Sequence, residues 1–141
     1  MSERFIWEGW CSLDVPRGWS WTQEEGVITL FRDNGVGALH LSFGRRERLG
    51  PVDSTEALEL ASSWARSRGW TDIGIRSVVL AGGPSAEFKY VEKTNEESTF
   101  WDVWYLVEHQ RAALFTYVCE SADAGVEENA RERIVASFTW R

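Results

Sequence analysis

Few side chains in this sequence have the chemistry of a reactive site. The two histidines, His40 and His109, and the two cysteines, Cys11 and Cys119, lie far from one another along the chain. Protein metal sites need several such ligands at short spacing. The sequence therefore predicts no metal site and no cofactor. We expect the histidines to be structural or surface residues and the cysteines to be buried, unpaired thiols in strands.

The glycine-containing segments lack the residues that phosphate binding or nucleophilic catalysis requires. The segment Gly35-Val36-Gly37 has no third glycine at the spacing of a dinucleotide-binding turn, and Gly82-Gly83 has no phosphate-loop lysine beside it. The sequence also contains no Gly-x-Ser-x-Gly motif, which positions the nucleophile in many hydrolases. These absences predict that the protein is not an enzyme.

One carboxylate, Asp102, has an unusual position because it lies inside an aromatic segment. A buried carboxylate with a perturbed pKa is a candidate catalytic or binding group. The alternatives are a solvent-facing acid on a half-exposed sheet and an acid bonded to Tyr117, its predicted cross-strand partner. We favour these two structural interpretations.

Composition and charge limit the class of protein. The chain has 141 residues, 43% of them hydrophobic and 26% charged, which predicts one globular domain over residues 1–141. The net charge of −7 argues against nucleic acid as a partner, since phosphate binding needs a basic surface. The sequence shows neither an apolar run of about 20 residues nor a signal peptide, so we expect no membrane span and a cytoplasmic location.

The hydrophobic pattern predicts an α+β fold. Most links between the predicted strands are too short for parallel crossovers, so the sheet should be largely antiparallel, with about six to eight strands and two main helices. Asp53 and Glu56 are expected to form a capping box at the start of the first helix, which ends at Gly69. The final helix should begin near Ser121 or Asp123. Strands are predicted at residues 5–15, 19–24, 27–32, 37–43, 73–80, 85–92, 98–108 and 112–120.

Two predicted hairpins fix which residues lie opposite one another. With Asn34-Gly35 as a two-residue loop, Leu30 lies opposite Leu39 and Phe31 lies opposite Ala38. A turn at His109-Gln110 likewise places Trp104 opposite Phe115. One sheet face then becomes aliphatic and the other mixed.

An aromatic sheet face is the predicted partner-binding surface. If no helix covers this face, it is a large aromatic patch, and such patches mark sites of protein interaction. If the C-terminal helix covers it, the same residues form part of the core. The predicted partner-binding residues are Phe31, His40, Phe100, Asp102, Trp104, Phe115 and Tyr117.

Two segments together resemble a known fold family. One is Val15-Pro16-Arg17-Gly18-Trp19, and the other is the late strand 113–120 that leads into Ile134-Val135-Ala136-Ser137-Phe138. This order of elements is similar to the Mog1/PsbP-like fold, which small bacterial domains of unknown function share. The resemblance implies a curved sheet and a mostly non-enzymatic role in binding another protein. No functional residue of a subgroup can be carried over, because this sequence matches no binding motif.

Three functions fit these observations. The leading hypothesis is a non-catalytic, cytosolic protein-binding domain of adaptor or chaperone type, for which a homodimer is compatible but not required. The alternative is an acidic immunity protein, because a charge of −7 would steer it toward a cationic toxin. The third is an enzyme or small-ligand binder with Asp102, His40 or Tyr117 in a sheet pocket.

Overall fold

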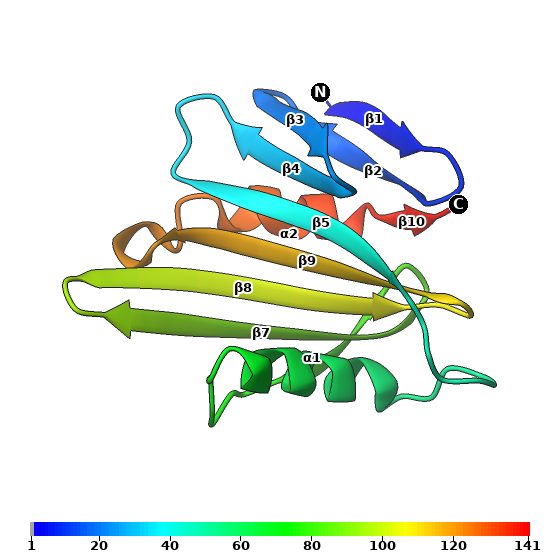
Figure 1. The fold of residues 1–141 in the computed structure, drawn as a ribbon. Helices are drawn as coiled ribbons and strands as arrows, with labels where there is room; N and C mark the ends of the chain where they lie inside the picture. Colours follow the sequence, from blue (N-terminus) through cyan, green and yellow to red (C-terminus); the bar gives the residue numbers. More distant parts are fainter. Residues whose placement is uncertain (1) are drawn as a thin grey trace.

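The computed structural model describes residues 2–141. A strongly twisted, seven-stranded antiparallel sheet forms the centre, with strand order β3-β4-β5-β9-β8-β7-β6 (Figure 1). Every neighbouring pair is antiparallel, as the short links predict. The strands are β3 (Trp19–Glu24), β4 (Val27–Arg32), β5 (Gly37–Arg45), β6 (Arg76–Leu80), β7 (Gly83–Thr94), β8 (Glu97–Val107) and β9 (Arg111–Glu120).

A second, three-stranded sheet contains both ends of the described chain. It consists of β1 (Ser2–Trp7), β2 (Cys11–Pro16) and β10 (Thr139–Trp140). The prediction of one strand over residues 5–15 is wrong, because a turn separates β1 from β2. Gly9 takes a positive φ of 80° in this turn, and the Trp10 N–H donates to the Trp7 carbonyl at 2.9 Å.

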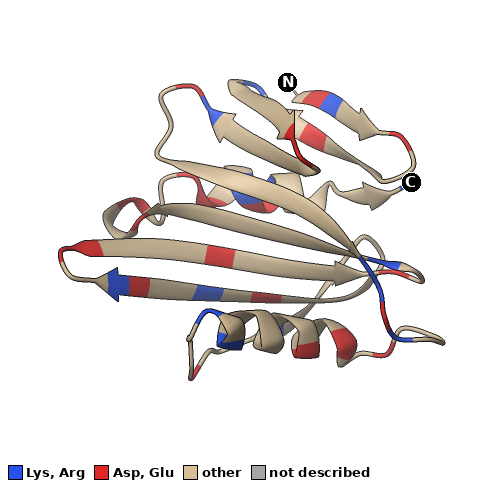
Figure 2. Cartoon of the chain, in the orientation of Figure 1, with Lys and Arg blue, Asp and Glu red and all other residues tan. Residues whose placement is uncertain are grey.

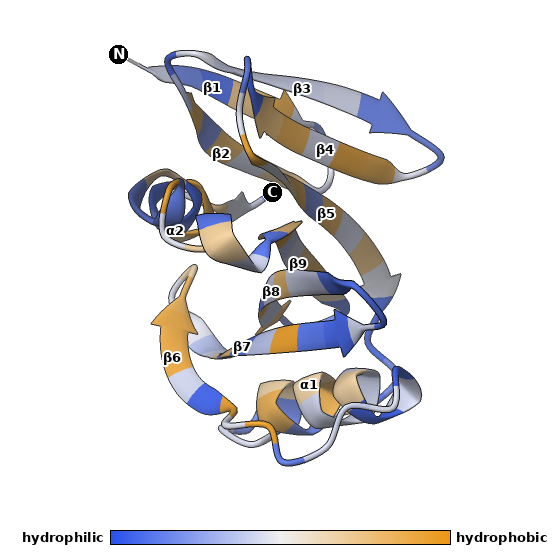
Figure 3. Ribbon diagram, turned by 90° about the vertical axis from the view of Figure 1, so that its left-hand side faces the viewer, coloured by the Kyte–Doolittle hydropathy of each residue, from blue (hydrophilic) through white to orange (hydrophobic). Residues whose placement is uncertain are grey.

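The two helices cover different parts of the large sheet. The first helix, α1 (Glu56–Ser67), packs on β7 and β8 and buries alanines at every fourth position. The second, α2 (Glu128–Ala136), follows a short 3₁₀ turn, η1 (Ser121–Asp123), and packs against β2. In Figure 3, α2 lies between the hairpin strands above it and the layer of β7 and α1 below it.

The first helix does not begin with the predicted capping box. Its carboxylate Glu56 forms an ion pair with Arg46 at 2.6 Å instead. Asp53 accepts a 2.8 Å hydrogen bond from the Thr55 N–H, two residues further on. The prediction is wrong because a charge-assisted bond to an arginine from outside the helix competes for the same carboxylate.

The predicted registers of the two hairpins are confirmed. Leu30 lies opposite Leu39, Phe31 opposite Ala38, and Trp104 opposite Phe115. Alternate residues therefore reach the two faces as expected, and one face meets α2 and the small sheet to form the main core. The structure is α+β and largely antiparallel, with seven strands in the main sheet and two helices.

Both cysteines lie in this core and are unpaired, as predicted. Burial raises the pKa of the Cys11 thiol to about 12, so it stays protonated at neutral pH. Over residues 2–141, no helix is both long enough and apolar enough to cross a membrane.

Candidate functional site

The structure divides the seven predicted partner-binding residues between the two faces of the large sheet. In β5, Leu39 lies opposite Tyr117, whereas His40 lies opposite Thr116. Since neighbouring residues of a strand point to opposite faces, His40 and Phe31 lie on the face that carries α1. The prediction that all seven share one face is therefore wrong for these two residues. The face that meets α2 carries Phe100, Asp102, Trp104, Phe115 and Tyr117.

The five residues that do share a face are buried. Asp102, Phe115 and Tyr117 have no exposed surface, and Phe100 is the most exposed of the five at 7%. They pack in the core with α2 residues such as Ile134. The aromatic face is therefore the inner side of the sheet and does not form an exposed patch.

Phe31 and His40 lie on the other face and are half-buried. Here α1 covers β7 and β8, whereas these two residues belong to β4 and β5. The His40 Nδ1 is 3.1 Å from the hydroxyl of Thr29. Burial lowers the pKa of His40, so its imidazole is neutral at pH 7.

Asp102 belongs to a charge cluster in which Glu87, Asp102 and Arg131 are buried, whereas Arg76 and Lys89 are exposed. Its Oδ2 atom accepts a 3.1 Å hydrogen bond from the Arg131 Nε and lies 3.9 Å from the Lys89 Nζ. Glu87 in turn accepts bonds from Lys89 at 2.7 Å and from Arg76 at 2.5 Å. Asp102 is therefore neither solvent-facing nor bonded to Tyr117, and its partner from α2 lay outside the predicted set.

The environment of the cluster moves the pKa values of its two carboxyl groups apart. Burial, together with the neighbouring Glu87 carboxylate, raises the pKa of Asp102 to about 8. Burial opposes ionisation of Glu87 as well, but the hydrogen bonds that it accepts outweigh this effect and lower its pKa to about 2. Because the two carboxyl groups interact, they titrate as a pair, with the pKa of Asp102 raised and that of Glu87 lowered.

A second buried contact holds the start of α2 on the sheet. The Tyr117 hydroxyl donates a 2.7 Å hydrogen bond to the Glu127 Oε1, and burial raises the pKa of this tyrosine well above its usual range. The Arg131 guanidinium carbon lies 4.6 Å from the Tyr117 ring centroid and 5.2 Å from that of Phe100. These contacts join α2 to β8 and β9, so their direct effect is on the fold.

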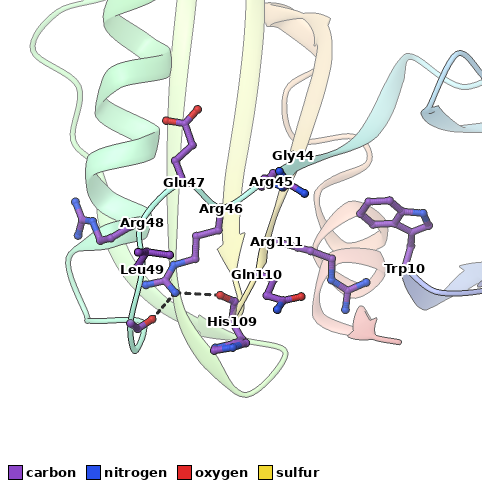
Figure 4. A pocket seen from close by; sticks show the side chains of 11 residues that line it. Trp10, Gly44, Arg45, Arg46, Glu47, Arg48, Leu49, His109, Gln110 and Arg111 are labelled. Carbon is purple, nitrogen blue, oxygen red and sulfur yellow. Dashed lines mark hydrogen bonds between the residues drawn. The ribbon is translucent and has the colours of Figure 1, made fainter.

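An open groove lies at the end of β5, beside the turn that joins β8 to β9. It has a volume of about 750 Å³ and lies between Trp10 and the loop that precedes α1 (Figure 4). Figure 2 shows basic residues gathered along the end of β5 and in the loop that follows it. Its lining is Trp10, Gly44, Arg45, Arg46, Glu47, Arg48, Leu49, Gly50, His109, Gln110 and Arg111.

A buried arginine builds one wall of this groove. The Arg46 guanidinium donates two hydrogen bonds to the Glu56 carboxylate, at 2.6 and 2.7 Å. Its other bonds go to the carbonyls of Gly50 at 2.5 Å, His109 at 3.0 Å and Pro51 at 3.1 Å. All five donors of the guanidinium are thus used. They fix residues 46–52, which we call the Arg46 loop, to α1 and to the β8–β9 turn.

Exposed groups of different chemistry surround the groove. Leu49, at the tip of the Arg46 loop, is 95% exposed. Arg45 is exposed and forms no ion pair within residues 2–141. On the other side, the Arg111 guanidinium carbon lies 5.6 Å from the Trp10 ring and 5.0 Å from the Trp140 ring. The groove therefore offers an apolar tip, free guanidinium donors and aromatic surface.

The lining of this groove offers hydrogen bonding, ion pairing and apolar contact. Across residues 2–141, no cluster of three His, Cys, Asp or Glu side chains has the geometry to hold a metal ion. The groove lining contains no serine, threonine or cysteine that could act as a nucleophile. Sequence reasoning missed this groove, and the dense charge of Arg45-Arg46-Glu47-Arg48 directly after a strand was the available signal.

The fold is similar to three solved structures of low sequence identity. A protein from Bacteroides thetaiotaomicron has a TM-score of 0.71 and 16% identity over 98% of this chain, which spans only 48% of that protein's chain. The cyanobacterial PsbP (CyanoP) of Synechocystis has a TM-score of 0.69 and 11% identity, with 99% of this chain and 92% of the other covered. The Ran-binding protein Mog1p of Saccharomyces cerevisiae has a TM-score of 0.59 and 9% identity, with 98% and 94% covered.

These matches establish the shape of the chain and nothing about its ligand. No model of a known protein family matches the sequence, and no curated protein matches it either. At 9–16% identity the likeness concerns the fold alone. The predicted Mog1/PsbP-like fold is confirmed.

Proposed function

We propose that this chain, which has the Mog1/PsbP-like fold, is a non-catalytic protein-binding domain whose partner docks at the Arg46 loop and its groove. The observation that carries the proposal is that Arg46 holds this loop firmly while the side chain of Leu49 is exposed. Five hydrogen bonds from one buried guanidinium hold the loop, and its tip presents Leu49 at 95% exposure. An apolar side chain on a rigid, projecting loop is an efficient anchor, because little conformational entropy is lost on binding.

The chemistry around the tip describes the partner surface. Leu49 would fill an apolar depression, and Arg45 would pair with a carboxylate at its edge. Trp10 and Arg111 would contact the flank of the partner, since arginine and tryptophan are frequent among the residues that dominate binding energy. One structural neighbour, the yeast Mog1p, is described as a Ran-binding protein, which supports protein binding as a use of this fold.

The experiment that tests this function compares two exposed apolar residues on different parts of the surface. Val79, on the edge strand β6, is 77% exposed and serves as the control for Leu49. We would capture partners from the native cell with the wild-type chain, Leu49→Ser and Val79→Ser. The expected result is one stoichiometric partner retained by the wild type and Val79→Ser but lost with Leu49→Ser. A partner that all three proteins retain would place the binding surface elsewhere.

A second candidate function is favoured by the net charge of −7. An acidic immunity protein would hold a cationic toxin mainly through charge, so its binding should weaken steeply as salt is raised. Binding through Leu49 should persist at high salt and depend on the loop. Repeating the capture at low and high salt therefore separates the two functions, because the immunity interpretation requires loss at high salt even with an intact Leu49.

A further inference from the structure

Three tryptophans enclose an arginine at the C-terminal end of α1. We call Trp64, Trp70 and Trp101 the tryptophan cage. The guanidinium carbon of Arg68 lies 5.2 Å from the Trp64 ring centroid, 5.0 Å from that of Trp70 and 4.5 Å from that of Trp101. All three distances are within the range of attraction between a cation and an aromatic ring.

The cage is built on rigid elements. Trp64 comes from α1, Trp101 comes from β8, and Trp70 follows a turn in which Gly69 has a φ of 79°. The Trp70 ring is 3% exposed and stacks on Tyr90 with 4.4 Å between ring centroids. The cage rings meet one another at 62–80°, with centroids 5.2–6.1 Å apart. At these angles the three rings surround one point and do not form a flat stack.

Arg68 is held in the cage by the rings alone. It is exposed, and within residues 2–141 its guanidinium forms no ion pair and no side-chain hydrogen bond. The Glu92 carboxylate is bonded to the Trp70 Nε1 at 3.3 Å. The Trp101 Nε1 is buried and has no acceptor among residues 2–141. The closed arrangement thus leaves one cage donor unsatisfied and anchors its cation only weakly.

The surface beside the cage is acidic. Glu92 lies opposite Thr99 in the pairing of β7 with β8, and Thr99 lies opposite Glu120 in the pairing of β8 with β9. These residues form a row next to the row of Tyr90 and Trp101, on the same face of the sheet. Figure 2 shows acidic residues gathered at this end of the molecule, around the tip of the β7–β8 hairpin. The local field therefore favours a cation.

We propose that the tryptophan cage is a binding site for the guanidinium group of an arginine on a partner protein, and that Arg68 occupies this site in the free chain. The incoming arginine takes the place of Arg68, so one ring-bound guanidinium replaces another. Glu92 and Glu120 attract the positively charged partner, and a backbone carbonyl beside its arginine supplies the acceptor that the Trp101 N–H lacks. Arginine suits the site better than lysine because its planar, weakly hydrated group stacks on aromatic rings.

The test uses the full chain and a small arginine probe. N-acetyl-arginine-N-methylamide would be titrated into the wild type and Arg68→Ala while the indole N–H resonances of the nine tryptophans are followed by NMR. The three cage resonances should shift in both proteins, and Arg68→Ala should bind about five-fold more tightly, because no internal arginine competes. The matched control is Arg66→Ala, which removes another exposed arginine, one of α1 that bonds to Ser62. It should bind like the wild type.

Two further results decide the matter. The citrulline analogue has nearly the same shape as the arginine probe but no charge, and it should leave the cage resonances in place. Trp101→Phe, checked for folding by its amide spectrum, should weaken binding of the arginine probe. Equal shifts with citrulline, or equal affinities of the wild type and Arg68→Ala, would overturn the proposal.

Discussion

The structure holds three arginines against aromatic rings, namely Arg68, Arg111 and Arg131, and the surroundings of Arg68 and Arg131 differ clearly. The guanidinium of Arg131, a residue of α2, is fully buried and lies over the rings of Tyr117 and Phe100. It also donates hydrogen bonds to Asp102 and to the Ala124 carbonyl. At the end of α1, the Arg68 guanidinium lies over three tryptophan rings and is exposed. More rings surround Arg68, yet of these two arginines it is Arg131 whose side chain has polar partners within residues 2–141.

This difference indicates which of the two arginines stabilises the folded state. An exposed contact between a cation and a ring contributes about 0.5–1 kcal/mol. Leaving a buried polar group without its hydrogen-bond partner costs about 1–3 kcal/mol, and removal of Arg131 would leave two such groups, Asp102 and the Ala124 carbonyl. Arg131 should therefore be needed for folding, whereas Arg68 should be replaceable without loss of structure. The following predictions measure both sides of this comparison.

The largest effect should come from Arg131→Met. This change leaves Asp102 and the Ala124 carbonyl without their donor, and we expect the free energy of unfolding to fall by about 3 kcal/mol or more. Urea unfolding followed by tryptophan fluorescence measures it. The control is the double variant Asp102→Leu/Arg131→Met, which replaces both members of the pair by apolar side chains and should recover part of the loss. A single variant as stable as the wild type would mean that Arg131 is not a structural residue.

The next effect concerns pH. Unfolded Asp102 releases its proton near pH 4, whereas folding holds that proton until about pH 8. Between these values the folded state binds more protons than the unfolded state, so raising the pH lowers stability. We expect this group to cost the wild type on the order of 3 kcal/mol between pH 5 and pH 8. Asp102→Asn cannot titrate, so its unfolding free energy should vary less over the same range. Parallel curves for the two proteins would contradict the raised pKa.

The hairpin part of this fold was predictable from the sequence because its signals are local. Alternating residues and two short turns placed Leu30 opposite Leu39 and Trp104 opposite Phe115, and the structure agrees. The strand predicted over residues 5–15 failed because Glu8-Gly9-Trp10 interrupts a continuous apolar pattern with a turn. The two-residue strand β10 is too short to carry any periodic signal.

The candidate sites were harder to predict because they join residues that are distant in the sequence. Arg131 and Asp102 are separated by 29 positions and meet only when α2 packs on the sheet. Arg46 reaches the carbonyl of His109, which is 63 positions away. The prediction placed Phe31 and His40 on the wrong face of the sheet, because the register within each hairpin does not determine how β5 pairs with β9. Such long-range pairings have no short-range signature.

The smallest expected effect comes from Arg68→Ala, and it tests the other half of the comparison. Because Arg68 is exposed and its guanidinium has no polar partner within residues 2–141, its removal should lower the free energy of unfolding by less than about 1 kcal/mol. Arg66→Ala provides the matched surface control, since that side chain bonds only to Ser62. Urea unfolding of the two variants should give nearly equal midpoints. A loss with Arg68→Ala as large as that with Arg131→Met would show that the exposed arginine holds the cage together, and the cage would then be part of the fold and not an exchangeable site.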